Sequence, residues 1–176
     1  MGESPVSAKG PNRATALMVV LLWGLLSLDA IAQGLPTPRF ASMRNDEANV
    51  RTGPGRQYPI EWVFVQQGLP VEIISEFDNW RQIRDWQGEG GWVHHSQLSG
   101  RRTAIVMAEE AQEMLRDPRP DGGLIARIEP LVLGDLIECP EPAAQEGAYC
   151  LFEASGLRGW LPRGTLWGVY PDEAVD

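Results

Sequence analysis

The stretch that decides the fold is NWRQIRDWQGEGGWVHHSQL, residues 79–98. Its first part, WRQIRDW, is dense in β-branched and aromatic residues, which favours a β-strand. The same density occurs in EWVFV (61–65), VEIISEF (71–77) and TAIVM (103–107). Gly, Pro, Asn and Asp separate these short runs. This spacing of turns predicts an all-β chain folded as small antiparallel barrels.

Part of this stretch recurs later in the chain. GGWVHHSQLSG (90–100) aligns with LRGWLPRGTLWG (157–168) at an offset of 68 residues, and VRTGPG (50–55) aligns with LRDPRP (115–120) at an offset of 65. Repetition at such a period predicts two successive units. We place them at residues 40–107 and 108–176, after a linker at 33–39. AEEAQEML (108–115) has a helix-forming composition, but the repeat predicts strand and loop there.

The N-terminus has the features of a secretory signal. Lys9 and Arg13 precede an apolar run of 15 residues (14–28), and Ala30 and Ala32 follow with the spacing of a cleavage site. We expect residues 1–32 to be a signal peptide cleaved after Ala32, leaving a periplasmic or secreted protein. The alternative is an uncleaved membrane anchor, although the run is shorter than the roughly 17–25 residues that a span needs.

Charge and cysteine content narrow the choice of partner and compartment. The net charge of −9 argues against a nucleic-acid ligand, which needs a basic face. The two halves differ, because residues 40–107 carry seven Arg and eight acids, whereas residues 108–176 carry five Arg and fourteen acids. The first unit also holds eight of the aromatic residues and the second holds five. In an exported protein the only two cysteines, Cys139 and Cys150, predict a disulfide.

The order of these blocks matches a known family. NVRTGPG, VFVQQGLPVEII and NWRQIRDWQGEGGWVHHSQL resemble the bacterial SH3-like (SH3b) domain family, and LRDPRPDGGLIARIEPLVLGDLIE through GWLPRGTLWG resembles a more divergent member. The resemblance covers residues 40–170. It implies two tandem SH3-like β-barrels without catalytic activity. It also implies a module that binds cell-wall peptides or glycans, or a partner protein, in the bacterial envelope.

A binding groove is expected around Trp80. Trp80 and Ile83 are three residues apart on a strand, so Trp80 points outward if Ile83 fills the interior. An outward aromatic there resembles the groove tryptophan of eukaryotic SH3 domains. The second groove aromatic is missing, because Gln97 and Thr165 stand at its positions, and this argues against ordinary polyproline binding. Candidate groove residues are Trp80, Tyr58, Trp92, Trp86, Arg51, His94 and Tyr149. Alternatively, Trp80 packs against Tyr58, Trp86 or the other unit.

The adjacent histidines do not predict a metal site. On a strand, His94 and His95 would point to opposite faces and could not bind one ion. No catalytic or cofactor-binding motif is present, so we expect no catalytic residue, metal or cofactor. The leading hypothesis is a non-catalytic exported binding module. A rigid structural or regulatory envelope protein is the alternative, followed by a cell-wall hydrolase or metalloenzyme.

Overall fold

A computed structural model describes residue 2, residues 35–143 and residues 148–176. Apart from residue 2, the predicted signal peptide lies outside the described residues, as do residues 33 and 34 of the predicted linker. Residues 36–176 form one compact unit. In the described part of the chain, no helix is long and apolar enough to cross a membrane.

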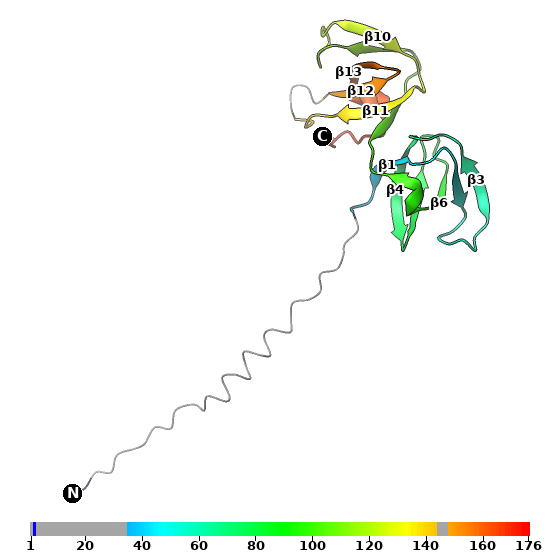
Figure 1. The fold of residues 1–176 in the computed structure, drawn as a ribbon. Coiled ribbons are helices and arrows are strands. Elements are labelled where there is room, and N and C mark those ends of the chain that lie inside the picture. Colours follow the sequence, from blue (N-terminus) through cyan, green and yellow to red (C-terminus); the bar gives the residue numbers. More distant parts are fainter. Residues whose placement is uncertain (1, 3–34, 144–147) are drawn as a thin grey trace. The chain divides into compact units, whose positions relative to one another are not determined.

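Two antiparallel sheets make up this unit (Figure 1). The first sheet has the strand order β3-β2-β6-β5-β4-β1-β7. Its strands are β1 (Arg39–Met43), β2 (Ala48–Arg51), β3 (Ile60–Phe64), β4 (Pro70–Phe77), β5 (Trp80–Arg84), β6 (Gly90–His94) and β7 (Leu98–Ser99), with the 3-10 helix η1 (His95–Gln97) before β7.

The second sheet repeats this order as β10-β9-β13-β12-β11-β8-β14. Its strands are β8 (Thr103–Val106), β9 (Gln112–Leu115), β10 (Leu124–Ile128), β11 (Leu133–Glu138), β12 (Tyr149–Ala154), β13 (Leu157–Pro162) and β14 (Leu166–Trp167), with the 3-10 helix η2 (Arg163–Thr165) before β14. The all-β prediction is therefore confirmed. The sheets are open rather than closed barrels, because in these described strands β3 does not pair with β7, nor β10 with β14.

The chain passes from the first sheet to the second between Ser99 and Thr103. Strand β8 pairs with β11 and β14, although the sequence assigned residues up to 107 to the first unit. Its backbone pairing thus places β8 in the second sheet, whereas the Thr103 hydroxyl donates to the Gly68 carbonyl oxygen and Ile105 packs in the first core. The division into two domains at residue 107/108 stays a prediction.

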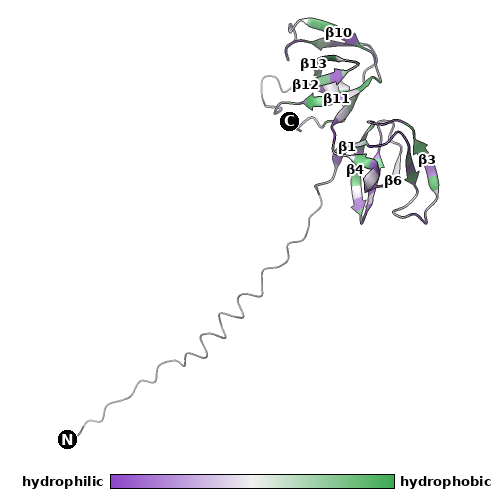
Figure 2. Cartoon of the chain, viewed as in Figure 1, coloured by the Kyte–Doolittle hydropathy of each residue, from purple (hydrophilic) through white to green (hydrophobic). Residues whose placement is uncertain are grey.

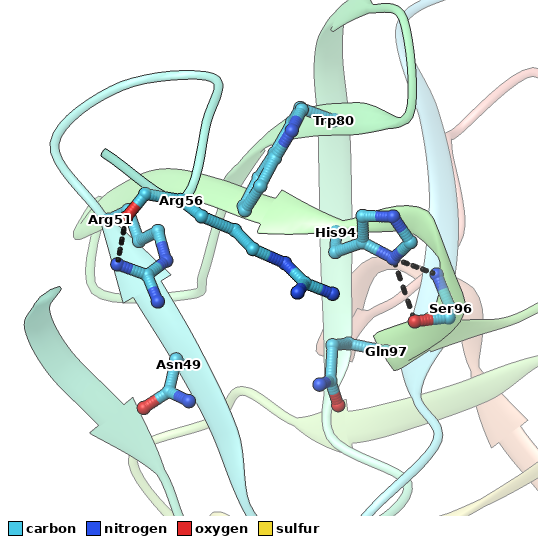
Figure 3. Close-up of a pocket in the computed structure, with 7 residues that line it drawn as sticks. All are labelled: Asn49, Arg51, Arg56, Trp80, His94, Ser96 and Gln97. Atoms are coloured by element: carbon cyan, nitrogen blue, oxygen red, sulfur yellow. Dashed lines mark hydrogen bonds between the residues drawn. The ribbon is translucent and has the colours of Figure 1, made fainter. Parts of the chain in front are cut away.

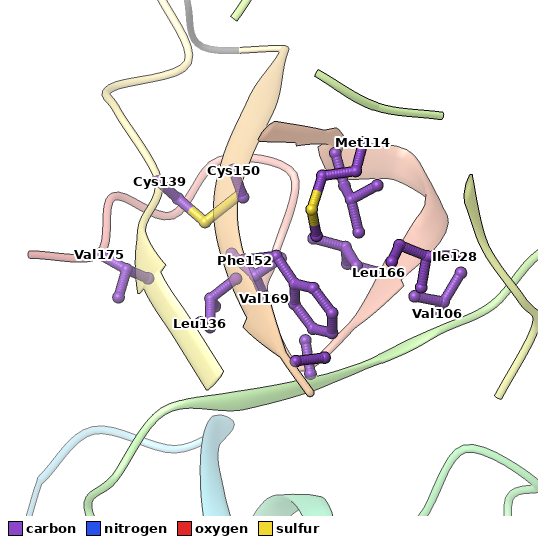
Figure 4. Close-up of a cluster of buried hydrophobic side chains, with 13 residues drawn as sticks. Val106, Met114, Ile128, Leu136, Cys139, Cys150, Phe152, Leu166, Val169 and Val175 are labelled. Carbon is purple, nitrogen blue, oxygen red and sulfur yellow. A yellow bond between two sulfur atoms is a disulfide. The ribbon is translucent and has the colours of Figure 1, made fainter. Parts of the chain in front are cut away.

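Each sheet buries an apolar inner face and leaves a mixed outer face. Strands such as β3 and β4 carry both apolar and polar residues (Figure 2). In the first sheet Val50, Ile83 and Val93 are buried in one core. In the second sheet Met114 and Phe152 belong to another core, shown in Figure 4. Burial of one such side chain stabilises the fold by about 1.5–3 kcal/mol.

A glycine before a tryptophan is required at the same place in both sheets. A Cβ on Gly91 would lie 2.6 Å from Val50 Cγ1 and 2.9 Å from the Arg51 carbonyl oxygen. A Cβ on Gly159 would lie 2.4 Å from Met114 Cγ and 2.8 Å from the Leu115 carbonyl oxygen. Glycine therefore allows two neighbouring strands to approach closely.

The strand register also corrects the repeat alignment. Arg51 lies opposite Trp92, and Leu115 lies opposite Trp160. Arg51 therefore corresponds to Leu115 at an offset of 64, one less than the sequence alignment gave. The register fixes this value because each pair is defined by the backbone, whereas the aligned letters alone allow a shift of one residue.

The predicted disulfide is present in the second sheet. Cys139 and Cys150 are bonded, and their Cα atoms are 4.3 Å apart. Both residues are fully buried, next to Leu136 and Val175 in the core (Figure 4). Backbone hydrogen bonds of 2.8 and 2.9 Å join Cys139 and Val175, so the bridge and the C-terminal segment are held together.

Candidate ligand-binding site

The outer face of the first sheet contains a hollow of about 320 Å³ (Figure 3). Strand β2, the loop 52–59, strands β5 and β6, and helix η1 contribute to it. The residues that line it are Asn49, Arg51, Arg56, Trp80, His94, Ser96 and Gln97. The lining thus combines one large aromatic ring, two guanidinium groups and two side-chain amides.

Trp80 and His94 form one wall of the hollow. The two residues lie directly opposite each other on β5 and β6. Their rings meet edge to face, with centroids 5.5 Å apart. On the other face of β5, Ile83 is buried in the core. Trp80 is only half-buried, so part of its ring remains available for contact with a ligand.

The two histidines do not point to opposite faces, so that expectation was wrong. Strand β6 ends at His94, and His95 begins helix η1. The strand alternation stops at this junction, and the two rings lie 4.6 Å apart between centroids. In residues 35–143 and 148–176, no group of three His, Cys, Asp or Glu side chains is placed to hold a metal ion.

His94 is fixed by the start of helix η1. Its Nδ1 accepts a hydrogen bond from the Ser96 backbone N–H at 3.3 Å and lies 2.7 Å from the Ser96 hydroxyl oxygen. A backbone N–H can only donate, so neutral His94 carries its proton on Nε2. Desolvation lowers the pKa of His94 below its usual 6.5, and the nearby charges of His95, Arg56 and Arg81 lower it further.

Arg51 holds the loop that forms the opposite wall. Its Nη1 donates to the carbonyl oxygen of Tyr58 at 2.7 Å and to that of Arg56 at 3.2 Å. The end of β2 is thereby tied to both the middle and the end of the loop. Because Arg56 projects from this loop, the guanidinium of Arg51 helps to position that of Arg56.

Arg56 extends across the middle of the hollow. Figure 3 shows its side chain reaching below Trp80 toward His94 and Gln97. Within the described chain, its guanidinium has no hydrogen bond or ion pair with another side chain. The Gln97 Oε1 atom already accepts a hydrogen bond from Asn45 Nδ2 at 2.7 Å, so its amide nitrogen remains for a ligand. The hollow therefore presents mainly hydrogen-bond donors.

A family model for the bacterial SH3 domain matches residues 44–100, which include the whole of this hollow. Residues 44–100 are a bacterial SH3 domain. Over 81 residues the chain is 32% identical to the "Putative N-acetylmuramoyl-L-alanine amidase YrvJ" of Bacillus subtilis (strain 168). That match spans 46% of this chain and 15% of the relative.

Two solved structures are also similar to the chain. NlpC1 from Trichomonas vaginalis has a TM-score of 0.33 and 11% identity, over 81% of this chain and 50% of that one. NlpC2 from the same organism has a TM-score of 0.32 and 10% identity, over 76% and 49% of the two chains. These scores are too low to support a conclusion about function.

The other candidate residues lie outside the hollow of the bacterial SH3 domain. Trp92 lines a different hollow, together with Gln82. Tyr58 is 39% exposed and covers Gly53, whereas Trp86 packs against the core. Tyr149 lies in the second sheet, opposite Pro162. Thus three of the seven predicted groove residues line the hollow together, namely Arg51, Trp80 and His94.

Four lining residues were not among the predicted candidates. Asn49, Arg56 and Ser96 carry no signal that a single sequence reveals, because they come together from a strand, a loop and a 3-10 helix. Gln97 had a signal, since it occupies the position of the missing groove aromatic. Because Gln97 is polar, this side of the hollow can form hydrogen bonds to a ligand, whereas an aromatic residue would offer only an apolar surface.

Proposed function

We propose that the bacterial SH3 domain is a non-catalytic module that binds cell-wall peptide or glycan through the hollow beside Trp80. The observation that carries this proposal is a half-buried tryptophan on the outer face, above a lining rich in donors. Aromatic rings supply contact area with few rotatable bonds, and side-chain amides and guanidinium groups fix the orientation of a polar ligand.

The relative supports the choice of ligand class. It is named as an N-acetylmuramoyl-L-alanine amidase, and this name combines an amino sugar with an amino acid. A module bound to such material would hold its protein at the cell wall. Because this chain spans only 15% of the relative, the amidase activity itself is not carried over.

The proposal includes an exported location and no catalysis. The predicted signal peptide at residues 1–32 supports export, and so does the disulfide, because such bonds persist in oxidising compartments. Both cysteines are consumed in this bond, so neither is a nucleophile. The hollow contains His94 but no cysteine, and no carboxylate lines it to form a catalytic pair.

The test is binding to purified cell wall. We expect Trp80→Ala to weaken sedimentation with cell-wall sacculi about tenfold or more, because a central aromatic anchor is lost. Tyr149→Ala in the second sheet is the matched control and should leave binding close to that of the unchanged protein. Circular dichroism would verify that both variants fold. Unchanged binding by folded Trp80→Ala would overturn the proposal.

A rigid structural protein is the second candidate, and aromatic contacts within residues 36–176 favour it. The ring of Phe40 lies 5.2 Å from that of Trp167 and 4.7 Å from that of Tyr170, between centroids. The Tyr170 hydroxyl donates to buried Glu72 at 2.7 Å. Burial and these contacts with Glu72 raise the pKa of Tyr170 above its usual value, so the phenol stays protonated.

Trp80 distinguishes the two candidates. Its ring contact is with His94, and it takes no part in the cluster around Phe40. Collisional quenching of tryptophan fluorescence, compared between the unchanged protein and Trp80→Phe, isolates the Trp80 signal. Binding through the hollow predicts a Trp80 that the quencher reaches in the free protein, whereas a purely structural role predicts a protected one.

A further inference from the structure

We propose that the hollow of the bacterial SH3 domain recognises a peptide carboxylate, which the guanidinium of Arg56 binds. This inference rests on the proposed cell-wall binding and names the chemical group that is recognised. Arg56 is the binding residue, Arg51 is a positioning residue, and Trp80 covers the apolar part of the peptide.

The free polar groups in the hollow are predominantly donors. Arg56 has no protein acceptor among the described residues, and the amide nitrogen of Gln97 is left over after its oxygen accepts from Asn45. Neutral His94 offers Nε2–H, because its Nδ1 accepts from the Ser96 backbone. Asn49 adds a further side-chain amide. A lining in which donors outnumber acceptors favours a ligand rich in acceptors, and an ionised carboxylate is such a ligand.

The local charge has the opposite sign to that of the protein. The whole chain has a net charge of −9, yet Arg51 and Arg56 line the hollow and no acidic residue does. Asp78 lines a second hollow, which Arg56, Trp80 and His94 also line, and forms no ion pair with Arg56. Elsewhere in the first sheet arginines are paired, as Arg84 is with Glu72. An unpaired guanidinium in a concave surface is therefore available for an external anion.

The side chains that line the hollow favour a carboxylate that is carried on a peptide. A guanidinium group matches a carboxylate through two parallel hydrogen bonds. The half-buried ring of Trp80 beside Arg56 offers an apolar surface for the carbon chain that carries the carboxylate. The two side-chain amides suit neighbouring peptide groups. Cell-wall peptides end in free carboxylates, so this group agrees with the ligand class proposed above.

The second sheet differs from the first in its loop arginine. Its corresponding loop has the same length, with Arg116 N–H bonded to the Gly123 carbonyl as Thr52 N–H is to Pro59. In this register Pro120 occupies the place of Arg56. The arginine of that loop, Arg119, is paired with Asp117 and Asp121. Arg119 therefore serves as a matched control, because it is a loop arginine of the same protein with its charge already neutralised.

The experiment is titration calorimetry on the full chain with two probes. One is a disaccharide-tetrapeptide released from purified cell wall, and the other is the same compound with its carboxylates converted to amides. We expect the unchanged protein to bind the free acid at least tenfold more tightly than the amide. Arg56→Gln should remove most of this difference, Arg56→Lys part of it, and Arg119→Gln none of it.

Several results would overturn the inference. Equal affinity for acid and amide would do so, and so would an Arg56→Gln variant that weakens both probes equally. Stronger competition by inorganic phosphate than by acetate would show a phosphate site instead. These results are separate from the test of the proposed function. Suppose that Trp80→Ala loses binding to sacculi, while Arg56→Gln keeps the difference in affinity between the acid and amide probes. In that case the proposed function stands, and only the inference that Arg56 binds a carboxylate fails.

Discussion

The two sheets of this protein have the same strand order but different outer faces. At the place where the first sheet pairs Trp80 with His94, the second pairs Tyr149 with Pro162. The inner positions stay apolar in both sheets, as Ile83 and Phe152 show. The apolar inner face therefore maintains the fold in both sheets, while the outer face can differ without loss of the fold.

Charge separates the two sheets in the same way. Leu115 in the second sheet replaces Arg51, so no guanidinium at this strand position ties the following loop back to its strand. Arg119 is paired with two acids, whereas Arg56 has no acidic partner among the described side chains. Residues 108–176 have an excess of acidic residues, and their loop arginine, Arg119, is neutralised. Residues 40–107 are nearly balanced in charge, and their loop arginine, Arg56, is available to a ligand.

The largest expected effect concerns stability and should be confined to the second sheet. Replacing both Cys139 and Cys150 by Ser opens a covalent loop, with a sequence separation of 11, and should cost about 3 kcal/mol of unfolding free energy. Urea unfolding followed by tryptophan fluorescence measures this loss. The first sheet contains no cysteine, so binding to cell wall by the folded variant should be unchanged. An unaltered unfolding midpoint would contradict the structural role of the bridge.

A smaller effect is expected when the first sheet is given the residue of the second. Arg51→Leu removes the hydrogen bonds to the Tyr58 and Arg56 carbonyl oxygens and frees the loop. Affinity for the disaccharide-tetrapeptide should fall about fivefold to tenfold, since Arg56 is less well positioned. The reverse change, Leu115→Arg, should have no effect on binding. Full affinity of Arg51→Leu would show that Arg51 has no positioning role.

The smallest expected effect is on pH dependence. The folded state lowers the pKa of His94 below 6.5, so the unfolded chain takes up the proton more readily, and this contribution to stability is present above pH 6.5 and lost as pH falls. Binding should change in the opposite direction. Protonated His94 adds a positive charge to those of Arg56 and Arg81, against which Asp78 is the nearby acid.

The measurement for this effect is the affinity for the disaccharide-tetrapeptide between pH 5 and pH 8. We expect about a threefold gain as pH falls below 6.5, where peptide carboxylates remain ionised. His94→Gln should give a flat curve and is the control. A flat curve for the unchanged protein would show that the charge of His94 plays no part in recognition.

The sequence predicted the scaffold better than the site. The strand-forming runs and the two cysteines correctly predicted the all-β class and the disulfide. The spacing of Trp80 and Ile83 also gave the direction of the Trp80 side chain. Trp86 has the same aromatic signal as Trp80, yet it packs against the core, because strand alternation does not apply at the turn after β5.

The positions of the histidines and of Arg56 depend on points where a β-strand ends. His94 and His95 come together because the chain leaves β6 and enters a 3-10 helix. Arg56 reaches the hollow because Arg51 ties its loop back to strand β2. Neither event has a periodicity that a single sequence can reveal.

By itself, then, the sequence determined the β class and the outward tryptophan, because period-2 alternation is a local property of the chain. Only the tertiary structure decided where the chain crosses between sheets and which arginine remains unpaired. Those features depend on hydrogen bonds and ion pairs between residues distant in sequence, whose geometry exists only after the strands have paired.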